Sequence, residues 1–200
     1  MVSQPIVAAT IHDQAFEYYS WNQLGSDVYA LAKQLLDDDS RFDRLIALAK
    51  GGLAPARALA DFLKIDQLSS IQVEFYTGIG QRGQTPVITQ SLPVQIKGER
   101  VLVFDDIVDS GKTFALASSY LTAHGAAEIS TAALIVKPWT KHRPDYAVHT
   151  TEAWVIMPNE VRETIELLSQ SWREKGDSTA SIKRQLRKIG FDPGQVDDFV

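Results

Sequence analysis

The apolar residues of this 200-residue chain fall into short continuous runs separated by stretches of helical periodicity. Runs rich in strand-forming residues predict four buried strands, at residues 44–49, 71–76, 101–104 and 129–136. Apolar residues at helical spacing predict helices over residues 21–37, 53–63 and 114–123. The first of these helices has a start signal, because Ser20 and Gln23 are spaced as a capping box.

Both ends of the chain carry weaker signals. A strand is expected around residues 6–9, and a short strand containing Trp154 over residues 151–158. Helices are expected over residues 160–173 and 179–189, followed by an acidic turn at 191–200. The 179–189 helix carries four basic residues, which suit either a solvated packing or dimerisation element, the favoured interpretation, or a nucleic-acid contact: Lys183, Arg184, Arg187 and Lys188.

Two long connections lack an apolar period. Residues 77–92 are rich in Gly, Gln, Thr and Pro, and a connection of this length is typical of a functional lid. Arg82 is the only cation within it. Residues 138–151 are polar and are expected to be irregular.

Composition narrows the class of protein. The length suits one ordinary domain with a small appendage. A formal net charge of −5 argues against a dedicated nucleic-acid binder, and the absence of cysteine excludes disulfides and thiolate metal sites. No basic-then-apolar leader and no apolar run of about 18 residues is present, so a cytoplasmic location without membrane contact is expected.

The densest chemistry follows the 101–104 strand. Asp105, Asp106 and Asp109 come at its carboxyl end, and a Ser-Gly-Lys-Thr turn at residues 110–113 leads straight into a helix. Ligands bind at the carboxyl ends of parallel strands, and such a turn offers amides, hydroxyls and an ammonium to a phosphate. Carboxylates beside a phosphate site indicate sugar hydroxyls, a divalent cation or both. The alternative is an ordinary strand–turn–helix with a capping acid.

A second anion site is indicated after the 44–49 strand, at Lys50-Gly51-Gly52. Paired glycines let backbone amides approach a charged ligand closely, although they also suit a tight strand–helix turn. Two further motifs are rejected. A P-loop would need glycine where Asp106 stands, and the dinucleotide-type pattern at residues 78–83 is not followed by a helix.

Residues 101–113 resemble the ribose-phosphate signature of type I phosphoribosyltransferases, and Lys50-Gly51-Gly52 resembles the pyrophosphate loop of that family, where a cis peptide often lies. The resemblance covers about residues 16–160. It implies an α/β fold, with a mostly parallel sheet flanked by helices on both faces. A small hood would be built from the N-terminal segment and residues 137–158, within a domain of residues 1–160. Residues 161–200 would form a C-terminal helical extension, and the 77–92 segment would close over pyrophosphate.

The last third of the chain is similar to purine enzymes of the xanthine–guanine type, with Lys-Pro after a strand and a later Trp-Val-Ile-x-Pro. The resemblance implies that Lys137 meets the purine 6-oxygen, that Trp154 stacks on the base, and that backbone near Val155 reads its edge. A core role for Trp154 is the alternative. Met157-Pro158-Asn159-Glu160 departs from the family's second aromatic, so guanine, hypoxanthine and xanthine all stay open.

The implied reaction transfers ribose-5-phosphate from phosphoribosyl diphosphate (PRPP) to a purine base, giving a nucleoside monophosphate and pyrophosphate. Asp105 and Asp106 would bind the ribose directly or through Mg²⁺, and Asp109 would be the general base. Pyrophosphate would meet Lys50, Gly51 and Gly52. The 5′-phosphate would meet Asp109, Ser110, Gly111, Lys112 and Thr113.

Three partner and function questions follow from the resemblance. Dimers are common in the family, so a homodimer is expected. A phosphoribosyltransferase for another base is an alternative, against which the Lys137–Trp154 pair argues. A second alternative is a regulator that senses PRPP or a nucleotide and whose residues 179–200 contact nucleic acid. The retained Asp109 and Lys50 favour the enzyme.

Overall fold

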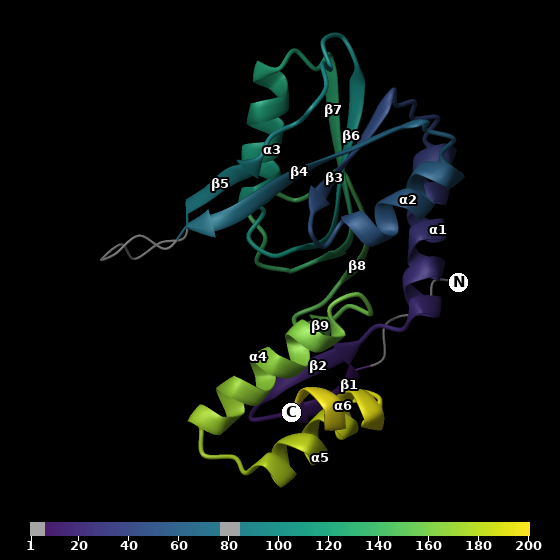
Figure 1. The fold of residues 1–200 in the computed structure, drawn as a ribbon. Helices are drawn as coiled ribbons and strands as arrows, with labels where there is room; N and C mark the ends of the chain where they lie inside the picture. Colours follow the sequence, from purple (N-terminus) through teal and green to yellow (C-terminus); the bar gives the residue numbers. More distant parts are fainter. Residues whose placement is uncertain (1–6, 77–84) are drawn as a thin grey trace. The chain divides into compact units, whose positions relative to one another are not determined.

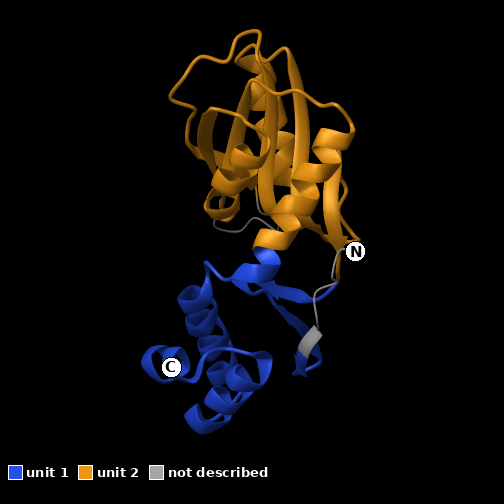
Figure 2. Cartoon of the chain, turned by 90° about the vertical axis from the view of Figure 1, so that its right-hand side faces the viewer, with its two compact units in different colours: residues 1–24, 152–200 blue, residues 25–151 orange. Residues whose placement is uncertain are grey.

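The computed structural model describes residues 7–76 and 85–200, which form two compact units (Figure 2). One unit is Gly25–Thr151, and the other contains the described residues up to Leu24 together with Glu152–Val200. The predicted division into residues 1–160 and 161–200 stays a prediction about the family domain, because the compact units divide at other points.

The larger unit is built on a six-stranded sheet of order β5-β4-β3-β6-β7-β8 (Figure 1). All neighbouring strands are parallel except β4 and β5, which form an antiparallel pair. The strand bounds are β3 Arg44–Ala49, β4 Gln67–Tyr76, β5 Thr85–Gln90, β6 Arg100–Val108, β7 Glu128–Val136 and β8 Tyr146–Thr150.

Helices cover both faces of this sheet, as the predicted α/β fold requires. Helix α1 (Trp21–Asp37), which enters this unit at Gly25, and α2 (Leu53–Phe62) lie on one side, and α3 (Lys112–Ala123) lies on the other (Figure 1). The α3 side chains Phe114, Ala117 and Leu121 are buried against strand residues such as Val101 and Val103. The capping box is present, since the Gln23 amide donates to Ser20 Oγ at 3.1 Å.

The sequence placed most of these elements correctly but missed two strands. Residues 85–90, expected inside a long lid, form β5, and the other described residues of that segment follow it. Residues 146–150, expected to be irregular and assigned to the hood, form the edge strand β8. Both are edge strands with little or no continuous burial, so neither shows the apolar run that identified the central strands. Arg82 and residues 78–83 lie outside the described residues.

The order of the strands creates a switch point between β3 and β6. From β3 the chain passes through α2 to β4 on one side, and from β6 it passes through α3 to β7 on the other. The helices that follow β3 and β6 lie on opposite faces of the sheet, so the carboxyl ends of these two strands form a topological switch point, which is where open α/β sheets bind ligands.

The smaller unit combines the N-terminal segment with the C-terminal residues. Its three-stranded sheet has the order β1-β2-β9, with β2 antiparallel to β1 and parallel to β9. The elements are β1 Val7–Ile11, β2 Gln14–Tyr18, β9 Trp154–Ile156, α4 Val161–Glu174, α5 Thr179–Ile189 and α6 Pro193–Phe199. The predicted hood stays a prediction; of its residues, this unit contains the described N-terminal segment and residues 152–158.

The helices of this unit share one core with the sheet. Phe16 and Ile156 from the sheet pack with Trp172 of α4, Ile182 of α5 and Val196 of α6. The rings of Phe16 and Trp172 meet edge-on, with centroids 6.2 Å apart. The C-terminal helices are therefore an integral part of the unit that contains β9, and not a separate tail.

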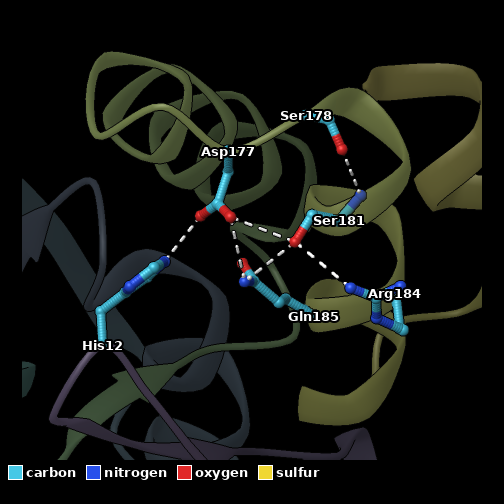
Figure 3. A network of polar contacts seen from close by, with 6 residues as sticks. All are labelled: His12, Asp177, Ser178, Ser181, Arg184 and Gln185. Carbon is cyan, nitrogen blue, oxygen red and sulfur yellow. Dashed lines mark hydrogen bonds and ion pairs between the residues drawn. The ribbon is translucent and has the colours of Figure 1, made fainter.

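A polar network joins the β1–β2 turn to the loop before α5 (Figure 3). His12 Nε2 and Asp177 Oδ2 are 2.6 Å apart, and Ser181 Oγ donates to Asp177 Oδ1 at 3.1 Å. The Ser178 side chain caps α5 by accepting from the Ser181 amide. His12 lies in the β1–β2 turn with a positive φ of 49°. Its contact with Asp177 therefore connects this turn to the loop before α5.

The basic residues of α5 are partly used in packing. Lys183 Nζ and Arg187 Nη2 both contact Asp197 Oδ1 of α6, at 2.9 and 2.8 Å. These ion pairs favour the packing interpretation of the basic helix over a nucleic-acid contact. Within the described part of the chain, the helices are too short or too polar for any of them to cross a membrane.

Candidate active site

Two loops meet at the switch point of the larger sheet. Strands β3 and β6 are hydrogen-bonded neighbours, with Ala47 paired to Phe104, and both run toward the same end. Lys50-Gly51-Gly52 follows β3 directly, and its Ala49–Lys50 peptide bond is cis, as the resemblance implied. The two segments that the sequence singled out are therefore brought side by side.

Each glycine of the Lys50-Gly51-Gly52 loop is required by a different neighbour. A Cβ at Gly51 would lie 2.7 Å from Oδ2 and 2.8 Å from Cγ of Asp106. A Cβ at Gly52 would lie 2.8 Å from the carbonyl oxygen of Phe104 and 2.9 Å from that of Leu48. The loop can therefore contact the end of β6 only because both side chains are absent.

The two adjacent acids lie within β6 and not after it, because the strand continues to Val108. Successive strand residues point to opposite faces, so Asp106 is buried at 6% exposure while Asp105 is more accessible. Asp106 Oδ1 accepts from the Ile107 amide at 2.8 Å, and Asp105 Oδ1 accepts from the Asp106 amide at 3.0 Å. Burial raises the pKa of the Asp106 carboxyl, and a hydrogen bond with Asp105 and bonds from backbone amides act in the opposite direction.

The turn after β6 is shaped for an anion. Gly111 is the N-cap of α3 with φ of 79°, in the left-handed region that favours glycine. Ser110 Oγ accepts weakly from the Lys112 amide at 3.4 Å. The first turn of α3 therefore presents amides and the positive end of the helix dipole beside Ser110 and Thr113, as a phosphate site needs.

The segment after β7 lies against this turn. Lys137, at 8% exposure, follows β7 directly, and its amide donates to the Val108 carbonyl at 2.9 Å. Trp139, two residues later, donates its indole N–H to Asp109 Oδ1 at 2.6 Å. Trp139 was not among the functional residues predicted from the sequence, although its position two residues after the predicted purine-binding lysine was a usable signal.

The other two predicted purine residues, Trp154 and Val155, belong to the smaller unit. Trp154 pairs with Phe16 and Val155 with Glu17, so their side chains lie on opposite faces of the three-stranded sheet. Trp154 is 44% exposed, which is inconsistent with the alternative that it is a core residue, whereas Ile156 is fully buried. Their roles toward a purine stay predictions.

The acids at the end of β6 suit a hard cation in their chemistry. Carboxylate oxygens are preferred by Mg²⁺, which is commonly held by one or two carboxylates together with substrate phosphates. Among the residues described, no group of three or more His, Cys, Asp or Glu is arranged to hold a metal ion. Asp105 and Asp106 therefore suit a cation that is held partly by a phosphorylated substrate. They suit less well a cation that is held by protein side chains alone.

Comparisons with known proteins agree with this geometry. Residues 15–164 match the model of the phosphoribosyl transferase domain. The xanthine-guanine phosphoribosyltransferase of Ruegeria sp. (strain TM1040) is 30% identical over 158 residues, which cover 74% of this chain and 86% of that protein. The enzyme of the same name from Nitratidesulfovibrio vulgaris (strain DP4) is 30% identical over 155 residues, covering 76% and 90%.

A solved structure is similar over the same region. The crystal structure of a purine phosphoribosyltransferase from Pyrococcus horikoshii OT3 is 40% identical, with a TM-score of 0.65, and the match covers 72% of this chain and 93% of that one. The family match stops at residue 164, before the end of α4.

Proposed function

Because the chain belongs to the phosphoribosyltransferase family, we propose that it transfers the 5-phosphoribosyl group from PRPP to a 6-oxopurine, giving a nucleoside monophosphate and pyrophosphate. The observation that carries this is the convergence of two anion-type loops at the β3–β6 switch point, with three carboxylates beside them. The relatives named for xanthine–guanine and purine substrates support the base class.

The 5′-phosphate is held by the turn that opens α3. The amides of Lys112 and Thr113 and the hydroxyls of Ser110 and Thr113 donate to its oxygens, and the helix dipole favours the negative charge. Gly111 makes the turn possible because its φ of 79° is unfavourable for other residues. Binding energy from this remote group fixes the anomeric carbon for attack.

The leaving pyrophosphate is received by the β3 loop. The cis Ala49–Lys50 peptide bond and the two glycines let this loop lie against β6, where the Gly51 backbone and the Lys50 ammonium would meet the pyrophosphate. The Gly52 amide is already used, since it donates to the Leu48 carbonyl at 3.0 Å. The Gly51 backbone and the Lys50 ammonium act on charge that grows as the bond to the ribose breaks, so they lower the barrier and not only the KM.

We place Mg²⁺ at Asp105 and Asp106, where it would neutralise pyrophosphate charge and orient the ribose hydroxyls. Asp105, on the more accessible face of β6, is suited to direct contact with ribose.

Two side chains would contact the purine: one lies just before the 110–113 turn and the other just after β7. Asp109 accepts the N7 proton as N9 attacks the anomeric carbon, and Lys137 binds the 6-oxygen. Stacking of Trp154 on the base and reading of the base edge by backbone near Val155 stay predictions from the sequence. We also propose a homodimer and a cytoplasmic location. Light scattering and cell fractionation, respectively, would contradict them by finding a monomer or a non-cytoplasmic pool.

The decisive test is pyrophosphate release from PRPP and Mg²⁺ with hypoxanthine, guanine, xanthine, adenine, uracil and orotate in parallel. Turnover with at least one 6-oxopurine and none with uracil or orotate is expected. No turnover with any base, while PRPP or a nucleotide still binds by calorimetry, would overturn the enzyme and favour a nucleotide-sensing regulator. The absence of DNA binding at low salt is expected as well.

A further inference from the structure

The position of Trp139 is set by a short turn tied to the phosphate-binding loop. The Thr140 amide donates to the Lys137 carbonyl at 3.0 Å, which closes a turn with Pro138 at the position where proline is favoured. The Lys137 amide donates to Val108 at 2.9 Å and the Lys141 amide to Ser110 at 3.3 Å. Both ends of this turn are therefore anchored to the chain on either side of Asp109.

Further contacts fix the turn at its centre and after it. Thr140 Oγ1 donates to the Val108 carbonyl at 3.1 Å and also contacts the Asp109 carbonyl. At Gly111, a Cβ would lie 2.6 Å from the His142 carbonyl oxygen and 2.9 Å from its nitrogen. Segment 137–142 thus follows residues 108–111 closely along its length, which places the backbone of Trp139 beside Asp109.

From this position the Trp139 side chain contacts two groups that the proposed function assigns to the purine. Its indole N–H donates to Asp109 Oδ1 at 2.6 Å, and its ring centroid lies 5.9 Å from Lys137 Nζ, within cation–π range. A hydrogen bond to a carboxylate is short and strongly directional, so it selects one orientation of the Asp109 side chain.

We propose that Trp139 is a positioning residue of the transfer reaction, which fixes the Asp109 carboxylate through Oδ1 so that Oδ2 faces the purine N7 proton. The inference rests on the proposed function. Trp139 transfers no proton itself: the proton moves from purine N7 to Asp109, and the indole N–H keeps its hydrogen throughout. The same ring, 53% exposed, keeps the Lys137 ammonium beside it at the end of β7.

If Trp139 positions Asp109, its substitution should change kcat but not the KM for PRPP. Trp139→Phe keeps an aromatic ring near Lys137 but removes the N–H, so the Asp109 carboxylate is free to rotate. We expect kcat to fall about 10- to 100-fold, the loss expected for one hydrogen bond to a charged group. The KM for PRPP should stay within about twofold, because the phosphate-binding amides are untouched.

The contact itself is tested without any substrate. The protein has four tryptophans, so uniformly ¹⁵N-labelled material gives four indole N–H signals, and Trp139→Phe identifies one of them by its loss. That signal should lie downfield and should move in Asp109→Asn, while the other three stay in place. A Trp139 signal that does not respond to Asp109→Asn would overturn the inference, whatever the activity.

The functional part uses a matched control and a double-mutant cycle. Trp21→Phe alters another exposed tryptophan, on α1, and should leave kcat unchanged. In an Asp109→Asn background, Trp139→Phe should cause less than about a twofold further loss, because the two residues act as one unit. Equal losses in both backgrounds, or equal effects of the Trp21 and Trp139 changes, would refute the positioning role. An unaltered enzyme inactive with every base would refute the proposed function while leaving the NMR contact intact.

Discussion

Gly51→Ala should damage this protein through one identifiable contact, the approach of the β3 loop to Asp106. The added Cβ would lie 2.7 Å from Asp106 Oδ2 and 2.8 Å from its Cγ, whereas optimal contacts between non-bonded carbons are about 3.5–4.0 Å. Asp106 cannot simply turn away, because it is buried and its Oδ1 accepts from the Ile107 amide at 2.8 Å.

The expected cost is the loss of that hydrogen bond. A bond to a charged group contributes about 1.5–3 kcal/mol, so the free energy of unfolding should fall by that amount. At a urea m-value of about 2 kcal/mol/M, the midpoint should fall by about 1 M. Activity should fall as well, because the amides of the loop and the Asp106 carboxylate would no longer hold their relative positions.

Gly25→Ala provides the control in the same compact unit. Outside its own helix backbone and its chain neighbours, no atom lies within 4 Å of a Cβ at this helical position, so the substitution should stabilise by about 0.5–1 kcal/mol. Urea unfolding followed by circular dichroism would compare both variants, with Gly51→Ala repeated in an Asp106→Ala background. If the clash is the cause, most of the cost disappears there. A cost that is unchanged without the Asp106 carboxylate would refute the reasoning.

Three further results are expected. Asp109→Asn should lower kcat by about 10²- to 10⁴-fold while PRPP affinity by calorimetry changes little, and equal losses in both would exclude it as the general base. Arg44→Met should lower the free energy of unfolding by about 1–3 kcal/mol and leave kcat unchanged, because Arg44 Nε and Nη2 bind Glu99 at 2.7 and 3.1 Å at the amino end of the sheet; a matching loss of kcat would contradict this. The hydrogen bond from His12 lowers the pKa of Asp177, so its stabilising contribution is complete above the ordinary carboxyl pKa of about 4 and is lost as the pH falls through the lowered value. Asp177→Asn should therefore reduce the loss of thermal stability between about pH 5 and pH 2, and identical pH profiles for the two proteins would count against the pair.

The sequence could not predict this last network, in which the side chains of His12 and Asp177 point toward one another (Figure 3). His12 and Asp177 are separated by 165 residues, and neither stands in a recognisable motif. The hairpin turn and the loop before α5 meet because the apolar faces of β1 and α5 share one core. Polar contacts of this kind form because packing brings distant segments together, so no local sequence motif predicts them.

In the large sheet, too, the sequence predicted some strands and missed others. The runs at residues 44–49 and 129–136 identified β3 and β7 almost to the residue, because central parallel strands are buried on both faces and must be apolar throughout. Strands β5 and β8 escaped detection because an edge strand needs only one neighbour and is partly exposed. Their existence depends on what they pair with, and not on their own composition.

At the candidate site, the sequence by itself was enough to predict a set of functional residues, whose roles stay predictions: the acids 105, 106 and 109, the 110–113 turn and the glycines after β3. These are local patterns, because a phosphate-binding turn is made by consecutive residues. Only the tertiary structure decided that the β3 loop contacts Asp106, and that the Trp139 indole N–H donates to Asp109. Both contacts join segments about 30 to 55 residues apart, and it is the pairing of parallel strands β3, β6 and β7 that brings their carboxyl ends together.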